Sequence, residues 1–483
     1  MARTRLQKAT TDYFSKLPAE VLRFIFAYFC PHCCNEYQWP FGAPPDSKRA
    51  ENRTTLYDLC LVSRRFHPFA QEVLHHSFDP YYPYTKWDAP NPWERRLEPF
   101  LQTIASRPDL ALSVKTVFLK KRLLEQLDFD RSRKAFYACS RVFGVSAIEF
   151  FDSYRNNLTI AIKRSFFRGI RPPVSMMRDD FVPIVAGQLL SILVAILPNL
   201  GHISLEKDFR WRFDVSPTTL DKLGVSSIAL KTLETDHNVP NLFARAPELE
   251  TLVTSGSERF PSMPSIRNLH IGSRHAVNAS NIEHLISACT GTLSAFSYTS
   301  YDSDVLSVLN FLDKPRFHAS LETLHLNMRR RDHRSDHNMP SLKQFAHLKK
   351  LFLPTYFLYG WKYFACCGGK CNFKSLADTL PSSIMSLDLS EQTLTPNGRM
   401  HDDLLSLSKD VAFAFPHLRE IRSNAGLIRD EYPKALFKSV GIDLIHQDPS
   451  ICCWIDTALT TLLNSVNYSH NLFWDVARYG DTL

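Results

Sequence analysis

Leu321-Glu322-Thr323-Leu324-His325-Leu326 places three leucines in the spacing L-x-x-L-x-L. Leu324 and Leu326 are two residues apart, so on a β-strand their side chains point to the same face. Leu321 precedes them, on the turn that leads into the strand. A strand this short cannot bury its apolar edge alone and needs an equivalent neighbour on each side. The stretch therefore predicts one unit in a stack of repeats.

The same pattern, with apolar substitutes for leucine, returns along much of the chain. Its other copies are Leu200/Ile203/Leu205, Leu230/Leu233, Leu249/Leu252, Ile266/Leu269/Ile271, Leu293/Phe296/Tyr298, Leu348/Leu351/Leu353, Ile384/Leu387/Leu389 and Leu418/Ile421, with an earlier candidate at Val114/Val117/Leu119. Helical patterns, such as 181–197 and 281–286, lie between the copies. This alternation predicts an α/β fold, here an irregular leucine-rich-repeat solenoid. The alternative is an ordinary α/β domain with chance leucines, because the spacing varies and the Asn of the full repeat motif is mostly missing.

The composition is that of a soluble folded protein. The 483 residues exceed the ~250–300 at which one hydrophobic core stops growing, so the chain must divide or repeat. Hydrophobic residues make up 44% and charged residues 22%, which excludes the disordered and collagen-like classes. The 57 Lys and Arg against 49 Asp and Glu give a net charge of +8, short of a dedicated nucleic-acid binder. We therefore expect no nucleic-acid partner.

The apolar stretches, the N-terminus and the cysteines indicate in which cellular compartment the protein works. The longest uncharged apolar stretch, 181–197, only reaches the lower limit of a membrane span and contains Pro183 and Gly187, so it predicts a buried helix and no membrane contact. No apolar region follows the basic N-terminus, so no secretory signal is visible. Eleven cysteines without such a signal predict reduced thiols in a cytoplasmic or nuclear protein.

The region 14–78 predicts a small helical unit. Pro18 suits the first position of a helix, and Glu20 falls in its first turn, where the helix dipole favours a negative charge. One apolar stripe is expected to follow from Val21, Ile25 and Phe29, with Leu22 and Phe26 beside them. A second helical pattern runs through Leu56, Leu59, Cys60, Val62, Phe66 and Ala70. The polar, Pro-rich stretch 30–55 predicts an inserted loop.

Two motifs in this region, L-P-x-E-V-L-x-x-I-F at 17–26 and L-C-L-V-S-R-R-F at 59–66, resemble an F-box, most closely those of filamentous fungi. The resemblance extends to the Cys-Pro-His-Cys segment at 30–33 and to the closing stretch 70–78, but the long insert departs from the family pattern. It implies a helical hairpin or trio that docks on the Skp-type adaptor of a cullin–RING ubiquitin ligase, while a downstream domain holds a target protein.

The resemblance also implies which residues would contact the adaptor. They are Leu17, Pro18, Glu20, Val21 and Ile25, with Leu59, Val62, Ser63 and Phe66 on the second element. Alternatively, these residues only pack the core of the unit itself, since about 65 residues need some core in any case.

These signals divide the chain into five parts. They are an N-terminal tail (1–13), the F-box-like unit (14–78, with its insert at about 30–55), a Pro- and aromatic-rich linker (79–99), the repeat domain (100–447) and a C-terminal cap (448–483). A cap is expected because an open solenoid end would expose its core.

The most metal-like cluster is Cys30-Pro31-His32-Cys33-Cys34, because the C-x-x-C spacing of Cys30 and Cys33 lets two thiolates reach one zinc ion. A closed site needs four ligands, and His32 or Cys34 cannot easily supply both of the others. The cysteines of 366–371 are a distant alternative source. We therefore expect ordinary reduced cysteines and no metal or other cofactor, with zinc as the alternative.

Three other segments contain residues that could bind a metal ion or a phosphate, but their sequences favour no such site. His333 and His337 would share one face of a helix, but neighbouring arginines repel a cation, so 332–337 predicts an exposed loop. The basic run 329–334 is interrupted by Asp332 and predicts a solvated loop, with a phosphate-binding patch as the alternative. Gly368-Gly369-Lys370 lacks the first glycine and the Ser or Thr of a phosphate loop, and no other catalytic signature is present. The chain is not expected to be an enzyme.

A recognition surface is expected where strand side chains point away from the core. By the period of two, its candidates are His202, Ser204, Asn268, His270, Thr323, His325, Glu420 and Arg422. The first hypothesis is a substrate receptor of a cullin–RING ligase, bound to an unknown protein substrate. The second is a repeat scaffold outside any ligase, and the third is a metalloenzyme that uses the Cys/His segments.

Overall fold

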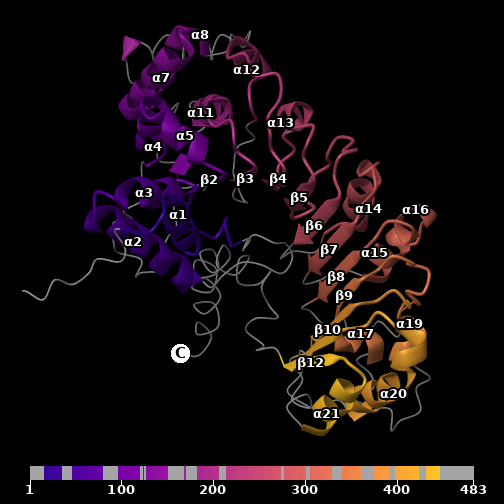
Figure 1. Ribbon diagram of the computed structural model, residues 1–483. Coiled ribbons are helices and arrows are strands. Elements are labelled where there is room, and N and C mark those ends of the chain that lie inside the picture. Colours follow the sequence, from indigo (N-terminus) through magenta and orange to yellow (C-terminus); the bar gives the residue numbers. More distant parts are fainter. Residues whose placement is uncertain are drawn as a thin grey trace, which may run out of the picture.

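The computed structural model describes residues 16–34, 46–79, 96–119, 123–124, 127–150, 168–169, 182–205, 214–272, 277–300, 305–328, 340–359, 375–390, 398–423 and 431–446. It is a mixed α/β protein with an open sheet of 12 strands, all neighbouring pairs of which are parallel. The strands lie side by side in the order of the sequence and form an arc, with the helices along its outer side (Figure 1). The predicted α/β class is confirmed.

The strands are short and evenly distributed over the chain. They are β1 (Ser77–Phe78), β2 (Thr116–Leu119), β3 (His202–Leu205), β4 (Thr232–Glu234), β5 (Thr251–Thr254), β6 (Asn268–Gly272), β7 (Ala295–Ser300), β8 (Thr323–Met328), β9 (Lys350–Pro354), β10 (Ser386–Ser390), β11 (Glu420–Ser423) and β12 (Asp443–His446). All ten copies of the repeat pattern lie on strands β2 to β11, as predicted. β1 and β12 have no L-x-x-L-x-L copy and were not predicted.

The helices fall into an N-terminal group and a series that alternates with the strands. The first group is α1 (Ala19–Ala27), α2 (Asp46–Val62) and α3 (His67–Leu74). The series is α4 (Leu97–Ser106), α5 (Pro108–Ser113), α7 (Phe129–Phe143), α8 (Ala147–Phe150), α11 (Val182–Ile196), α12 (Pro217–Lys222), α13 (Pro240–Arg245), α14 (Ala279–Ala288), α15 (Val305–Leu312), α16 (Pro315–His318), α17 (Thr355–Tyr359), α19 (Leu376–Thr379), α20 (Gly398–Ala414) and α21 (Glu431–Ser439). The predicted helices at 181–197 and 281–286 are α11 and α14.

A repeated backbone hydrogen bond keeps the strands in register. Just before each strand from β1 to β10, one carbonyl oxygen accepts two N–H groups from the start of the next unit. Glu322 O, for example, accepts from Lys349 N at 2.8 Å and Lys350 N at 3.0 Å. The series begins at His76 O, which accepts from Lys115 N at 2.8 Å and Thr116 N at 3.0 Å. Because the same atoms pair in unit after unit, loops of different length leave the sheet unchanged.

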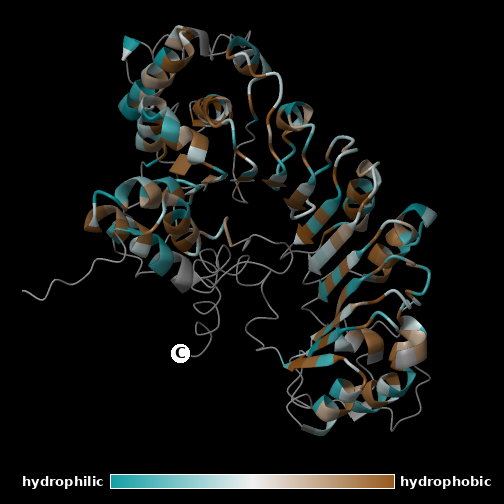
Figure 2. Cartoon of the chain, viewed as in Figure 1, coloured by the Kyte–Doolittle hydropathy of each residue, from teal (hydrophilic) through white to brown (hydrophobic). Residues whose placement is uncertain are grey.

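Two separate hydrophobic cores follow from this arrangement. The larger runs from Phe78 to Ile442 between the sheet and its helices, and contains the apolar positions of every repeat. Leu324 and Leu326 are both fully buried in it, at a gain of about 1.5–3 kcal/mol for each such side chain. Helix α11 lies in this core and is brown along most of its length in Figure 2. The smaller core belongs to α1, α2 and α3 alone.

Three predictions about the N-terminal region were wrong in detail. The buried side chains of α1 are Leu22 and Phe26, followed by Cys30 in the turn after the helix; each lies one residue beyond the predicted Val21, Ile25 and Phe29. The predicted loop 30–55 is helical from Asp46, where α2 starts. The second helical pattern is two helices, because the turn at 63–66 ends α2 and starts α3.

The predicted linker 79–99 was also too long. Helix α4 starts at Leu97 and includes Pro99, which a first helical turn tolerates because its N–H groups have no partner within the helix. The remaining linker residues 80–95, the tail 1–13, the basic run 329–334, the His333/His337 segment, the cysteines of 366–371 and the cap 448–483 lie outside the described residues. Among the described helices, none has the length and apolar character to cross a membrane.

Candidate functional site

Helices α1 and α2 carry apolar side chains on exposed faces. On α1, Phe24 is 66% exposed and packs edge-on against Tyr28, with 5.4 Å between the ring centroids. On α2, Tyr57 and Leu61 lie one turn apart and are exposed, and Val62 beside them is 68% exposed. Of the fifteen large apolar side chains exposed in the described part of the chain, six lie between residues 21 and 62. Such a concentration is typical of a surface that binds another protein.

The nine residues predicted to contact an adaptor divide into two groups. Those that are exposed are Pro18, Glu20, Val21 and Val62. Those that are partly buried are Leu17, Ile25, Leu59, Ser63 and Phe66. The four apolar members of the second group pack against the small core. The structure thus brings both sequence motifs into one helical unit and gives part of them a packing role.

Ser63 in addition forms the turn between α2 and α3. Its carbonyl oxygen accepts the N–H groups of Phe66 and His67, and its hydroxyl accepts the N–H of Arg65 at 3.2 Å. Ser63 therefore stabilises the turn between α2 and α3, which accounts for a serine at this position without a partner.

Four exposed apolar residues, Phe24, Tyr28, Tyr57 and Leu61, were missed by the sequence analysis. The pair Phe24 and Tyr28 could be seen in the sequence, but its exposure follows only from the burial of Leu22 and Phe26 in the structure. Leu22, Phe26 and Cys30 already form a buried stripe with a period of four, so Phe24 and Tyr28, also four apart, must face elsewhere. An aromatic pair outside the buried stripe of a short helix indicates a surface function.

Contacts with α3 and with the turn before it hold α1 in place. Arg23 of α1 forms an ion pair with Glu72 of α3, with 3.1 Å between Nε and Oε2, and its guanidinium lies over the ring of Phe69, 5.2 Å from the centroid. The rings of Phe26 and Phe66 pack edge-on at 5.7 Å. A partner of this unit would therefore meet a surface that is already formed, which lowers the entropy cost of binding.

The predicted recognition positions on the sheet do face away from the leucine core, but they differ in exposure. Ser204, Asn268, Thr323, Glu420 and Arg422 are partly exposed, whereas His202, His270 and His325 are buried. The prediction of an accessible side chain was wrong for the three histidines. Strands lie only about 4.8 Å apart, so side chains at one level of the sheet cover each other.

Two of the buried histidines, His202 and His325, contact a side chain on an adjacent strand, and His270 is buried within the sheet. His325 stacks on Phe352, with 4.1 Å between ring centroids, and its Nδ1 lies 3.1 Å from Ser297 Oγ. His202 Nε2 lies 2.9 Å from Glu234 Oε1. Burial lowers the pKa of His270 and of His325 to about 3, so both imidazoles are neutral at pH 7.

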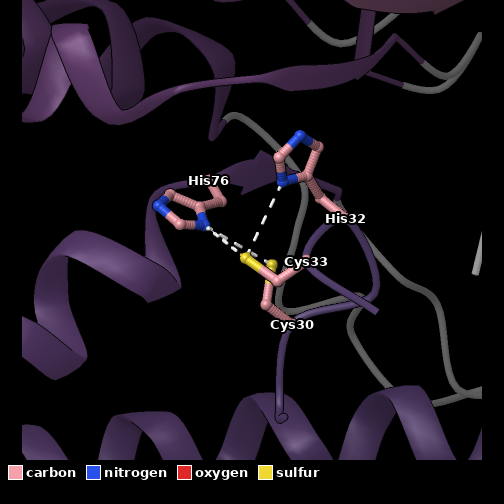
Figure 3. A group of neighbouring side chains, drawn as sticks. All are labelled: Cys30, His32, Cys33 and His76. Atoms are coloured by element: carbon pink, nitrogen blue, oxygen red, sulfur yellow. Dashed lines mark hydrogen bonds between the residues drawn. The ribbon is translucent and has the colours of Figure 1, made fainter. Parts of the chain in front are cut away.

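A second candidate site lies at the end of the helical unit. Cys30, His32, Cys33 and His76 place one sulfur or ring nitrogen each within 4.8 Å of all the others (Figure 3). His76 Nδ1 is 3.6 Å from Cys30 Sγ and 3.2 Å from Cys33 Sγ, and His32 Nδ1 is 3.8 Å from Cys33 Sγ. The thiol of Cys30 donates a hydrogen bond to Cys33, which lowers the pKa of Cys33 and raises that of Cys30.

The local backbone explains why the two cysteines meet. After α1 the chain continues in tight turns, in which Cys30 N donates to Ala27 O and Cys34 N donates to Cys30 O, both at 3.0 Å. These turns bring residues 30 and 33 to the same side. Cys34 points away from them, because its thiol donates to the carbonyl oxygens of Ala27 and Tyr28.

His76 is the member of this cluster that the sequence analysis missed. It lies between α3 and β1, 43 residues beyond Cys33, and no motif connects the two positions. The available signal was the His75-His76 pair in the closing stretch 70–78.

Comparisons with known proteins add nothing to these observations: no family model matches the chain, and no curated protein matches it significantly.

Proposed function

We propose that this chain is the substrate receptor of a cullin–RING ubiquitin ligase. In this proposal α1, α2 and α3 are an F-box that binds a Skp-type adaptor, and the parallel sheet with its outer helices is a leucine-rich-repeat-like solenoid that binds a target protein. Cullin and RING subunits would be reached through the adaptor. The chain would work in the cytoplasm or the nucleus.

The exposed apolar side chains of α1 and α2 are the observation that carries the proposal. A helical unit with its own small core has no internal need for Phe24, Tyr57 or Val62 on its outside. Burial against a partner would remove these groups from water at a gain of about 1.5–3 kcal/mol each. The two F-box-like sequence motifs lie on the same helices, which supports an adaptor as the partner.

The regular sheet supports the second half of the proposal. Strands that pair only with their sequence neighbours, in constant register, are typical of a solenoid, whose long surface suits the binding of a protein. Such a receptor performs no chemistry on its target. Its mechanism is positioning: it raises the effective concentration of the target beside the ubiquitin-carrying enzyme. No cofactor of the reaction is required from this chain.

Co-purification of the full chain with a recombinant Skp-type adaptor tests the proposal. The variants Phe24→Asp and Val62→Asp place a charge on exposed positions and leave the small core intact. Each is expected to weaken adaptor binding by at least about tenfold, the equivalent of about 1.4 kcal/mol. The matched control is Phe413→Asp on α20, because Phe413 is 93% exposed and belongs to a different part of the chain.

The expected result is a complex with the unmodified chain and with the Phe413 variant, and little or none with the other two. Failure of the folded, unmodified chain to bind the adaptor would refute the proposal. Equal binding by all four chains would show that the adaptor uses another surface.

A scaffold that acts outside any ligase is the second candidate. It is favoured by the packing of Leu17, Ile25 and Phe66 against the small core, which accounts for part of the F-box-like motif without a partner. The same binding experiment separates the two, since a scaffold of this kind would not bind the adaptor.

A further inference from the structure

We propose that Cys30, His32, Cys33 and His76 bind one zinc ion, which joins the helical unit to the start of the sheet. The inference concerns the junction of the two parts and does not depend on the identity of the partner of α1 and α2.

The spacing of the donor atoms fits a tetrahedral zinc site. Zinc lies about 2.3 Å from a thiolate sulfur and about 2.0–2.1 Å from an imidazole nitrogen, so a regular tetrahedron separates sulfur from nitrogen by about 3.6 Å. Of the four sulfur–nitrogen pairs, three are 3.2, 3.6 and 3.8 Å apart, and the fourth, Cys30 with His32, lies within 4.8 Å. The three shorter distances lie on both sides of the ideal value, so a metal ion at the centre needs only small side-chain movements.

The donor set also suits zinc in number and type. Two cysteines and two histidines are a common complete set for a structural zinc ion, and C-x-x-C is its usual pair spacing. His76 supplies the fourth ligand that the sequence around residue 30 lacks. Figure 3 shows both imidazole rings with a nitrogen turned toward the sulfur of Cys33. A disulfide between Cys30 and Cys33 would give these nitrogens no role.

The charge and proton balance of binding is simple. Both cysteines bind as thiolates, so each thiol loses one proton and two protons pass to the solvent for every zinc ion bound. Both imidazoles bind as neutral ligands. Two thiolate charges cancel the two charges of the ion, so a complete site leaves no net charge beside the buried Cys30.

The position of the site explains what zinc would do. Three ligands come from the turn after α1, and the fourth comes from the residue directly before β1. The carbonyl of His76 begins the series of backbone hydrogen bonds that runs through the sheet. A metal ion on its side chain would therefore connect α1 to the first strand pair. It would also close a loop of 43 residues between Cys33 and His76, which restricts the unfolded chain.

Metal analysis of the purified, reduced full chain tests this inference. We expect about one zinc ion per chain by mass spectrometry. After removal of zinc by a chelator, added Co²⁺ should produce the visible absorption of a tetrahedral cobalt site with thiolate ligands. The test variants are Cys33→Ser and His32→Ala, whose side chains are not fully buried, and His76→Ala. The matched control is Cys34→Ser, the neighbouring cysteine whose thiol points away from the cluster.

Each test variant should weaken zinc binding by more than about 100-fold, since even an outer-shell partner is worth about 10- to 100-fold. The control should bind as the unmodified chain does. Circular dichroism establishes that each variant is folded, and a chelator should lower the melting temperature of the unmodified chain and not that of folded Cys33→Ser. The inference is overturned if the reduced, folded chain binds neither zinc nor cobalt. It is also overturned if Cys33→Ser retains the affinity, or if Cys34→Ser loses it.

Discussion

Acid should destabilise the sheet through two buried histidines. His270 and His325 have a pKa of about 3 in the folded chain, against 6.5 when exposed. The Glu234 carboxylate raises the pKa of His270, but desolvation by burial outweighs it. The folded state therefore binds fewer protons than the unfolded state between these values. The contribution of the two neutral histidines to the free energy of unfolding is complete above about pH 6.5 and is lost as the pH falls toward 3.

The size of the effect follows from proton linkage. Between about pH 7 and about pH 5, an exposed histidine takes up about 0.7 of a proton, whereas a histidine with a pKa of about 3 takes up almost none. The free energy of unfolding should fall by about 2 kcal/mol for each of the two residues over this interval, or by about 4 kcal/mol for the pair. That is a large part of the 5–15 kcal/mol typical of a folded domain.

Urea unfolding at the two pH values, followed by far-UV circular dichroism, measures this loss. In the variant His325→Phe the ring can still stack on Phe352, but no group titrates. The variant should lose about 2 kcal/mol less than the unmodified chain between the two pH values. Other titrating groups, such as Glu98 and Asp214 with their raised pKa values, affect both proteins equally and cancel.

His347→Phe is the control, because His347 is exposed and meets solvent in the folded and the unfolded state. Its pH dependence should equal that of the unmodified chain. If His325→Phe also shows the full loss, the buried histidine is not the cause and the reasoning fails.

Three further predictions follow from packing and burial. Leu324→Ala should lower the free energy of unfolding by about 2–5 kcal/mol in urea titrations, because it removes a fully buried side chain between two strands; a loss below about 1 kcal/mol would contradict the described core. Gly291→Ala should cost about 1–3 kcal/mol, because the added Cβ would overlap the carbonyl oxygen of Pro264, and a melting temperature equal to that of the unmodified chain would refute that close approach. Cys139 and Cys289 should resist alkylation in the folded chain, since burial raises the pKa of each thiol to about 12, and peptide mass spectrometry after brief iodoacetamide treatment would reveal rapid labelling if this is wrong.

The repeated part of the fold was predictable because its signal is both local and repeated. Leu324 and Leu326 define one strand by their spacing, and each of the nine further copies of the pattern lies on a strand of its own. β1 was not predictable in this way. It has two residues, Ser77 and Phe78. It is a strand because it pairs with the distant β2, where Lys115 and Thr116 donate their N–H groups to His76 O and the hydroxyls of Ser77 and Thr116 are hydrogen-bonded across 39 residues.

The candidate sites were less predictable because their determinants lie on separate elements. Whether Ile25 or Phe24 is exposed depends on the position of α3, which the residues of α1 do not encode. His76 joins Cys30 and Cys33 only after α2 and α3 have folded back on α1. The burial of His325 likewise depends on Phe352, one strand further along the sheet. The alternation of side chains along a strand predicts that His325 points away from the leucine core, but not which residues surround it.

Because the strands follow one another in sequence order, the number of strands between two points of the sheet fixes the distance between them. Twelve strands in sequence order, about 4.8 Å apart, place β12 roughly 50 Å along the arc from β1. A ligand held at a given strand would lie at a distance from α1, α2 and α3 that is counted in strands. Addition or loss of one unit would change that reach by about 4.8 Å and leave all other pairings intact. The length of the chain between β1 and β12 thus sets a distance as well as a surface.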